Sequence, residues 1–177
     1  SLAWTGGDIS AATVNTSGAT IGTGGTKKIT GAAQLNLSGN TTWSADTIST
    51  GGGAQLKNTG TFTTSTDATI ADDQGGTRAT FTNNGTFQKT NTGSGGTTDI
   101  QVSFQNNSTG TVAVDGGTLA LSGGGASSGS VTLGAGAKLK ISGNDFAFTA
   151  GALNGASGIV EIASNTTTFS NATSGSA

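Results

Sequence analysis

Hydrophobic residues recur at every second position in short stretches of the chain, with polar or small residues between them. This period-two pattern predicts β-strands that turn one face inward and the other face to solvent. Hydrophobic residues at helical spacing are scarce, so we expect no helix longer than about one turn. The clearest alternating pairs are Leu35/Leu37, Val112/Val114, Leu119/Leu121, Leu139/Ile141, Phe146/Phe148 and Val160/Ile162.

Two short motifs repeat along the sequence. The first reads apolar, polar, Asn, turn, Gly-Thr, apolar, and its copies start at Leu56, Phe81 and Phe104, which are 25 and 23 residues apart. In the second motif, two apolar residues are separated by one other residue and followed by Ser-Gly. Its copies at Leu119 and Leu139 are 20 residues apart. Spacings of about 20–25 residues are typical of the coils of a parallel β-helix.

The repeats predict an all-β protein: a single-stranded right-handed parallel β-helix, or β-solenoid, with about eight coils of 20–25 residues. Such a rod needs only a few inward side chains per coil, which suits a chain with 32% hydrophobic and 9% charged residues. We expect residues 1–177 to form one domain. Residues 1–50 match the motifs less well and are the candidate for an atypical N-terminal cap or docking segment.

Each copy of the first motif carries Asn at the same place, next to a corner of the coil. Asn tolerates the positive φ that a tight corner requires, and its side-chain amide can bond to the next coil. Inward aromatic residues at equivalent positions should likewise stack inside the core. The predicted ladder is Asn58, Asn83 and Asn106, and the predicted stacks are Phe62 on Phe87 and Phe81 on Phe104.

The composition points away from catalysis. The chain has no Cys, which excludes disulfides and thiolate metal sites, and no His, the commonest general base and metal ligand. Seven basic and nine acidic residues give a net charge of −2 and no basic patch, so nucleic acid is not an expected partner. We therefore expect a non-enzymatic protein with no catalytic residue, no cofactor and no bound metal.

The charged residues are sparse and are expected in solvent. Asp72 and Asp73 are the only adjacent acidic pair, and they lie in a sequence typical of a turn. A carbohydrate-cleaving enzyme would need carboxylates clustered in a groove, and a weak calcium site built from this pair and Asp67 is the other alternative. Lys138 and Lys140 alternate with apolar residues, which predicts that they point outward from one strand.

The stretch Phe81–Gly125, FTNNGTFQKTNTGSGGTTDIQVSFQNNSTGTVAVDGGTLALSGGG, resembles the repeats of large bacterial secreted and surface β-helix proteins. The part GTLALSGGGASSGSVTLGAGAKLKISG is similar to the strand repeats of autotransporter passengers and filamentous-haemagglutinin-like adhesins. The resemblance extends from Leu56 to Ile162. It implies an extracellular or cell-surface location in bacteria, and it implies no catalytic residue.

The two ends of a solenoid expose unpaired strand edges and the end of the core unless something caps them. No amphipathic capping helix is evident in the sequence at either end. Uncapped ends can stack head to tail, and such a contact makes a filament because it does not close. The candidate docking residues are Trp4 and Ile9 at one end and Phe169 at the other, with Trp4 capping its own core as the alternative.

These observations favour an extracellular structural protein that self-associates end to end, as the subunit of a bacterial surface filament or biofilm matrix fibre. Its partner would be a second copy of itself or the flanking repeats of a longer chain. The alternative is an adhesin stalk segment whose outer Thr/Asn face contacts glycans or a host surface. No apolar run approaches the length of a membrane span, so a membrane is not an expected partner.

Overall fold

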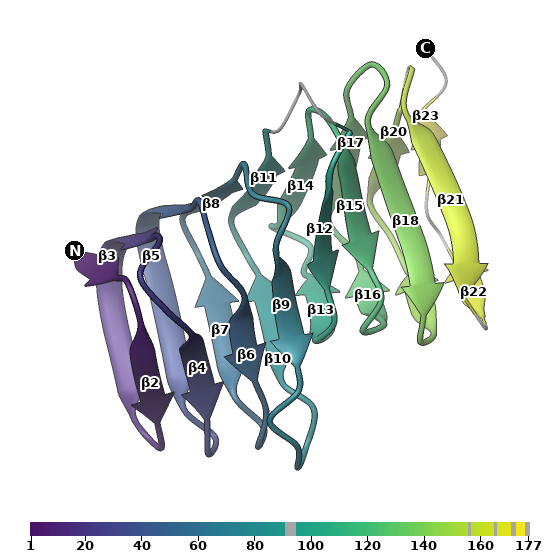
Figure 1. The fold of residues 1–177 in the computed structure, drawn as a ribbon. Coiled ribbons are helices and arrows are strands. Elements are labelled where there is room, and N and C mark those ends of the chain that lie inside the picture. The colour runs from purple at the N-terminus through teal and green to yellow at the C-terminus, as the bar shows by residue number, and fades with distance from the viewer. Residues whose placement is uncertain (91–94, 156, 165, 171–172, 176–177) are drawn as a thin grey trace.

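In the computed structural model, the chain is a stack of parallel coils of β-strand (Figure 1). The structure describes residues 1–90, 95–155, 157–164, 166–170 and 173–175, and no helix occurs in them. Each coil contributes strands to three successive faces of the stack, which we name face 1, face 2 and face 3. The predicted β-solenoid is therefore confirmed.

Face 1 is an eight-stranded parallel sheet whose spatial order follows the order along the chain. Figure 1 shows its strands side by side, from purple β2 at one end of the stack to yellow β21 at the other. The strands are β2 (Gly7–Ser10), β4 (Lys27–Thr30), β6 (Ile48–Thr50), β9 (Thr69–Asp72), β12 (Thr97–Ile100), β15 (Thr118–Leu121), β18 (Lys138–Gly143) and β21 (Ile159–Ser164).

Faces 2 and 3 are the two parts of a second, 15-stranded sheet that meet at a corner. The long strands β3 (Thr13–Ile21) and β5 (Gln34–Trp43) span this corner, and the two halves of β5 pair with β7 and β8 respectively. Face 2 continues with β7 (Gln55–Asn58), β10 (Thr80–Asn83), β13 (Ser103–Asn106), β16 (Gly125–Ser127), β19 (Phe146–Phe148) and β22 (Thr167–Phe169). Face 3 holds β1 (Leu2–Trp4), β8 (Thr61–Thr64), β11 (Thr86–Lys89), β14 (Thr111–Val114), β17 (Ser130–Leu133), β20 (Ala152–Asn154) and β23 (Thr173–Gly175).

The strand register is continuous from one end of face 1 to the other. Successive members of one inward column are 20–22 residues apart, except for one 30-residue coil between Ile70 and Ile100. Residues 1–50 carry β1 to β6, which extend the same three faces as later coils. The column is Gly7, Lys27, Ile48, Ile70, Ile100, Leu121, Ile141 and Ile162.

Glycine at the corner between faces 2 and 3 allows the coils to approach closely. A Cβ added at Gly60 would collide with the carbonyl oxygen of Gly39, and one at Gly85 would collide with that of Gly60. None of these glycines has a positive φ, and neither do Asn58 and Asn83 beside them. The predicted positive φ at this corner is therefore wrong, since close contact between coils is what selects glycine there.

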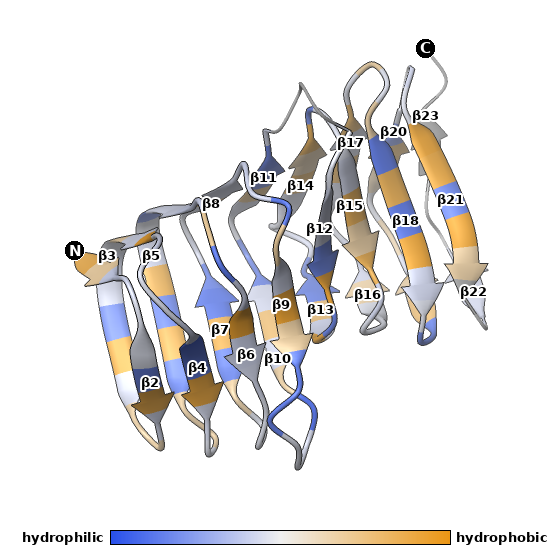
Figure 2. Cartoon of the chain, viewed as in Figure 1, coloured by the Kyte–Doolittle hydropathy of each residue, from blue (hydrophilic) through white to orange (hydrophobic). Residues whose placement is uncertain are grey.

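The core is a narrow column of buried apolar side chains along the whole stack. Phe62 and Phe87 stack with ring centroids 5.4 Å apart, and Phe81 and Phe104 stack at 5.5 Å, as the repeat predicts. The two stacks also meet edge to face, with Phe81 and Phe87 at 5.6 Å and 83°. Figure 2 shows the corresponding alternation of hydrophobic and hydrophilic bands along β18 of face 1.

Candidate functional site

The three asparagines of the repeat form a buried ladder at the corner between faces 2 and 3. Asn58 Nδ2 donates to Asn83 Oδ1 at 2.8 Å, and Asn83 Nδ2 donates to Asn106 Oδ1 at 2.9 Å. Asn58 Nδ2 also donates to the carbonyl oxygen of Thr86, and the ladder ends where Asn106 donates to Ser127 Oγ at 3.0 Å. Because these donors bind other coils of the chain, the ladder joins coils and is not an open binding site.

Two lysines that the sequence analysis does not single out are buried in the core. Lys27 and Lys89 have fully buried side chains in inward columns. Lys27 Nζ lies 3.2 Å from Asp46 Oδ2, and Lys89 Nζ lies 3.5 Å from Asp67 Oδ1. Burial lowers the pKa of Lys89, and the nearby charge of Asp67 opposes that shift. The carboxylates are 40% and 45% exposed, so each pair joins the core to a loop.

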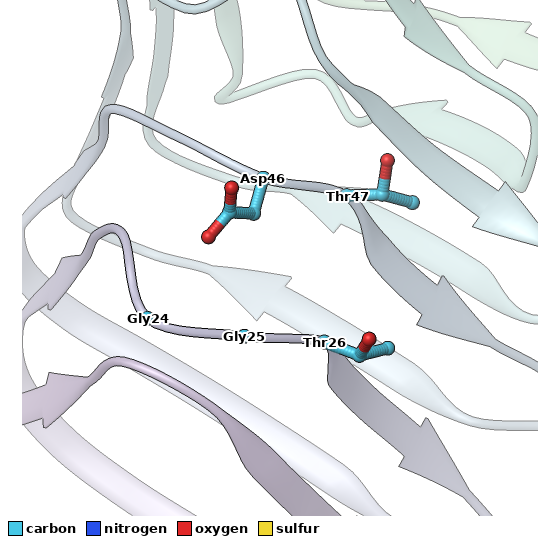
Figure 3. A pocket seen from close by; sticks show the side chains of 5 residues that line it. All are labelled: Gly24, Gly25, Thr26, Asp46 and Thr47. Carbon is cyan, nitrogen blue, oxygen red and sulfur yellow. The ribbon is translucent and has the colours of Figure 1, made fainter.

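A pocket of about 460 Å³ lies between the loops that precede β4 and β6 (Figure 3). The hydrogen bond from Lys27 lowers the pKa of Asp46, and the backbone N–H groups of Gly24 and Gly25 bind the same carboxylate. Asp46 therefore ties the two loops together instead of presenting a free carboxylate to a ligand. The pocket is lined by Gly24, Gly25, Thr26, Asp46 and Thr47.

The adjacent acidic residues close the turn between β9 and β10. Asp72 accepts hydrogen bonds from Arg78 Nε at 3.3 Å and from the backbone N–H of Ala79 at 3.2 Å. Asp73 accepts one from Ser49 Oγ of the preceding coil at 3.1 Å. Both carboxylates thus have partners that order the loop. Over the described residues, no group of three or more His, Cys, Asp or Glu side chains is placed to hold a metal ion.

The outward lysines of β18 bind the next coil. Lys138 Nζ lies 2.7 Å from Glu161 Oε2, and Lys140 Nζ lies 3.1 Å from Glu161 Oε1. These hydrogen bonds lower the pKa of Glu161. Each of the three side chains is more than a third exposed. Solvent therefore screens their attraction, and the network adds little stability.

The C-terminal end of the stack leaves apolar core positions uncovered. Ile162 of β21 continues the inward column of Ile141, and Phe169 of β22 stacks on Phe148 with ring centroids 4.9 Å apart. Ile162 and Phe169 are nevertheless 50% and 51% exposed. They are exposed because β21 and β22 are edge strands, each paired on one side only. Ile159, also on β21, is 53% exposed for a different reason, since it is in register with the outward Lys138.

The N-terminal end of the stack is better covered. Trp4 is only 5% exposed, packs in the core of its own chain and donates from Nε1 to the carbonyl oxygen of Gly7 at 3.3 Å. The geometry therefore matches the alternative in which Trp4 caps its own column, and its ring is not free to dock on a neighbour. Ile9 is half-buried against the same core. What this end leaves open is the unpaired backbone edge of β1 and β2.

The outer surface of face 3 carries two aligned columns of uncharged side chains. Parallel pairing aligns two outward columns across β5, β8, β11, β14 and β17. Hydroxyl and amide groups predominate, and neither column contains a charged residue. The first column is Asn40, Thr61, Thr86, Thr111 and Ser130, and the second is Thr42, Thr63, Gln88, Ala113 and Thr132.

The fold and its ends define the class of the molecule as a β-solenoid repeat protein. Comparisons with protein-family models, with curated proteins and with solved structures find no match. In the part of the chain that the structure describes, no helix has the length and hydropathy to cross a membrane.

Proposed function

We propose that this chain is a non-enzymatic structural protein that self-associates end to end, as the subunit of a bacterial surface filament or matrix fibre. The observation that carries the proposal is the half-exposed Ile162 and Phe169 at the uncovered end of the core. Covering the exposed half of each would contribute about 1 kcal/mol. The edge strands beside them offer unpaired N–H and C=O groups to the same partner.

The resemblance to bacterial secreted β-helix repeats, stated above, supports an extracellular location for this subunit. The neutral, polar surface suits a protein that other copies must contact without electrostatic repulsion: only 9% of its residues are charged, and its net charge is −2. The proposed mechanism is therefore strand pairing combined with covering of the core, and it requires no cofactor.

Two substitutions on the same strand test the proposal. Asp in place of Ile162 would have to be buried without a partner at the junction, so Ile162→Asp should abolish assembly. Ile159→Asp is the matched control, because Ile159 is equally exposed but faces outward, and it should assemble normally. The measurement is electron microscopy and light scattering over a concentration series, with circular dichroism to verify folding.

The wild-type chain should form filaments with an axial repeat near the length of one rod, about 35–40 Å for eight coils. A wild-type chain that stays monomeric at high concentration would contradict end-to-end association. Equal loss of assembly in both Asp variants would show that the uncovered core is not the contact.

The uncharged columns of face 3 favour a second candidate, an adhesin stalk that contacts glycans or a host surface. Hydroxyl and amide groups such as those of Thr61, Thr63 and Gln88 can hydrogen-bond to sugar hydroxyls, and the aligned strands present them at regular spacing. Binding of the folded monomer to a glycan array distinguishes this function from filament formation.

A further inference from the structure

The two ends of the described stack have unpaired edge strands on the same three faces. At one end, β1, β2 and the first half of β3 each have a strand partner on one side only, and at the other end β21, β22 and β23 do. Every strand pair between these ends is parallel. A second copy moved along the axis by eight strand spacings would thus meet the open edges of faces 1 and 2 with edges of matching direction. On face 3, which has nine strands instead of eight, its β1 would fall at the position of β23.

The inward columns define a register in which large side chains meet small ones. Continuing the face 1 column places Ile162 of one copy on Gly7 of the next. Continuing the face 2 column places Phe169 on Thr16. Gly7 has open space beside it, because a Cβ added there would meet nothing within 4 Å. The half-exposed Ile162 and Phe169 would therefore have room to be covered.

The same register brings no like charges together. The outward position next to Ile162 is Ala163, which is in register with Ser142, and in the next copy it would face Asp8 beside Gly7. Glu161, already bound to two lysines of its own chain, would face Gly6. Like charges directly opposite each other destabilise strand pairs, and this junction has none on face 1.

Building on the proposed end-to-end association, we infer that the occupant of each end is a second copy of this chain added in continuous register. In this arrangement β2 of the next copy pairs with β21 and its β3 pairs with β22, so two parallel ladders extend from one subunit into the next. Face 3 has nine strands, one more than face 1 or face 2, so β1 of the next copy takes the place of β23 beside β20, and β23 leaves that place. On faces 1 and 2 the junction repeats the contact between coils within one chain.

Disulfide trapping tests this register, and the chain has no cysteine that could interfere. In the variant Asp8→Cys/Ala163→Cys, the two thiols of adjacent copies lie on neighbouring parallel strands about 4.8 Å apart, within the range that a disulfide spans. The matched control Ser10→Cys/Ala163→Cys moves one thiol by two residues along β2, which takes the Cα separation to about 8 Å, too far for a disulfide.

After mild oxidation, the first variant should give a ladder of covalent oligomers on a denaturing gel that reducing agent abolishes, and the control should give none. Light scattering can show assembly while the first variant fails to cross-link, whether or not the control pair cross-links. In that case the proposed register is wrong, and end-to-end association is not contradicted. If neither variant nor the wild type assembles, the proposed function fails and this inference fails with it.

Discussion

At the residue scale, one buried side-chain polar atom lacks a hydrogen-bond partner in the part of the chain that the structure describes. The side chain of Thr41 is buried between Ala19 and Phe62 in the face 3 column, and its hydroxyl has no hydrogen-bond partner among the described residues. Thr41→Val removes this hydroxyl while preserving shape, and it should raise the free energy of unfolding by about 1–2 kcal/mol. Urea denaturation measures this change, and the outward Thr42→Val should stay within about 0.5 kcal/mol of wild type.

The buried Lys89 should make stability depend on pH in the alkaline range. Burial lowers its pKa below the usual 10.5, so between the lowered value and 10.5 the unfolded chain binds more protons than the folded chain. The contribution of Lys89 to stability should therefore rise with pH in this interval. The measurement is the free energy of unfolding between pH 8 and pH 10.5 for wild type and Lys89→Met.

The Lys89→Met variant should lack this rise, and near pH 7 it should be at least as stable as wild type, because the substitution removes a buried charge. Asp67, which loses its lysine partner, is 45% exposed and remains hydrated. The exposed Lys57→Met is the control and should keep the wild-type pH dependence. Identical pH profiles for wild type and Lys89→Met would contradict this account of Lys89.

At the element scale, the asparagine ladder links β7, β10 and β13 through side chains as well as through backbone pairing. Asn83→Ala would remove one of the two acceptors of the Asn58 amide, which keeps only the carbonyl oxygen of Thr86. It would also remove the Asn83 donor to Asn106 Oδ1, in a dry environment. The expected loss is about 2–4 kcal/mol of unfolding free energy, since each unsatisfied buried group costs about 1–3 kcal/mol. Denaturant unfolding monitored by circular dichroism measures this loss.

The control for the ladder is a second asparagine pair on the surface. Asn107 Nδ2 donates to Asn84 Oδ1 at 2.7 Å, but this contact is exposed to water. Asn107→Ala should therefore cost no more than about 0.5 kcal/mol. If the two alanine variants lost equal stability, burial would not be what gives the inner ladder its strength.

At the scale of the whole molecule, the fold and much of the core follow from the sequence because the repeat places each residue in a column. The ladder and the Phe62 to Phe104 stacks occupy their predicted columns for this reason. Charge alone predicts exposure for the two buried lysines, Lys27 and Lys89, and that prediction is wrong. Side chains alternate along a strand, so residues two apart share a face. Lys27 is two residues from the buried Ile29, and Lys89 is two residues from the buried Phe87, which places both lysines on the inward face.

The repeat does not predict which end of the core is covered by the chain itself. Trp4 and Phe169 look alike as apolar residues near an end of the sequence, yet Trp4 is 5% exposed and Phe169 is 51% exposed. The difference depends on how the first coil folds back, including the bond from Trp4 to Gly7, and no repeat describes that contact. The alternation of Val160 and Ile162 predicts an inward Ile162, but its 50% exposure is evident only once the coils are stacked and β21 is seen to be an edge strand.

The single 30-residue coil shows that the rod can lengthen a loop without disturbing its columns. The loop between β9 and β10 is anchored on either side, because Gly52 N–H donates to the carbonyl oxygen of Gly75, and Gly53 N–H donates to that of Thr77. The peptide bond between Gly75 and Gly76 lies at its exposed tip, between two fixed points. A foreign peptide grafted at this bond would be displayed once per subunit, so a filament of this chain would carry it as a regular, evenly spaced array.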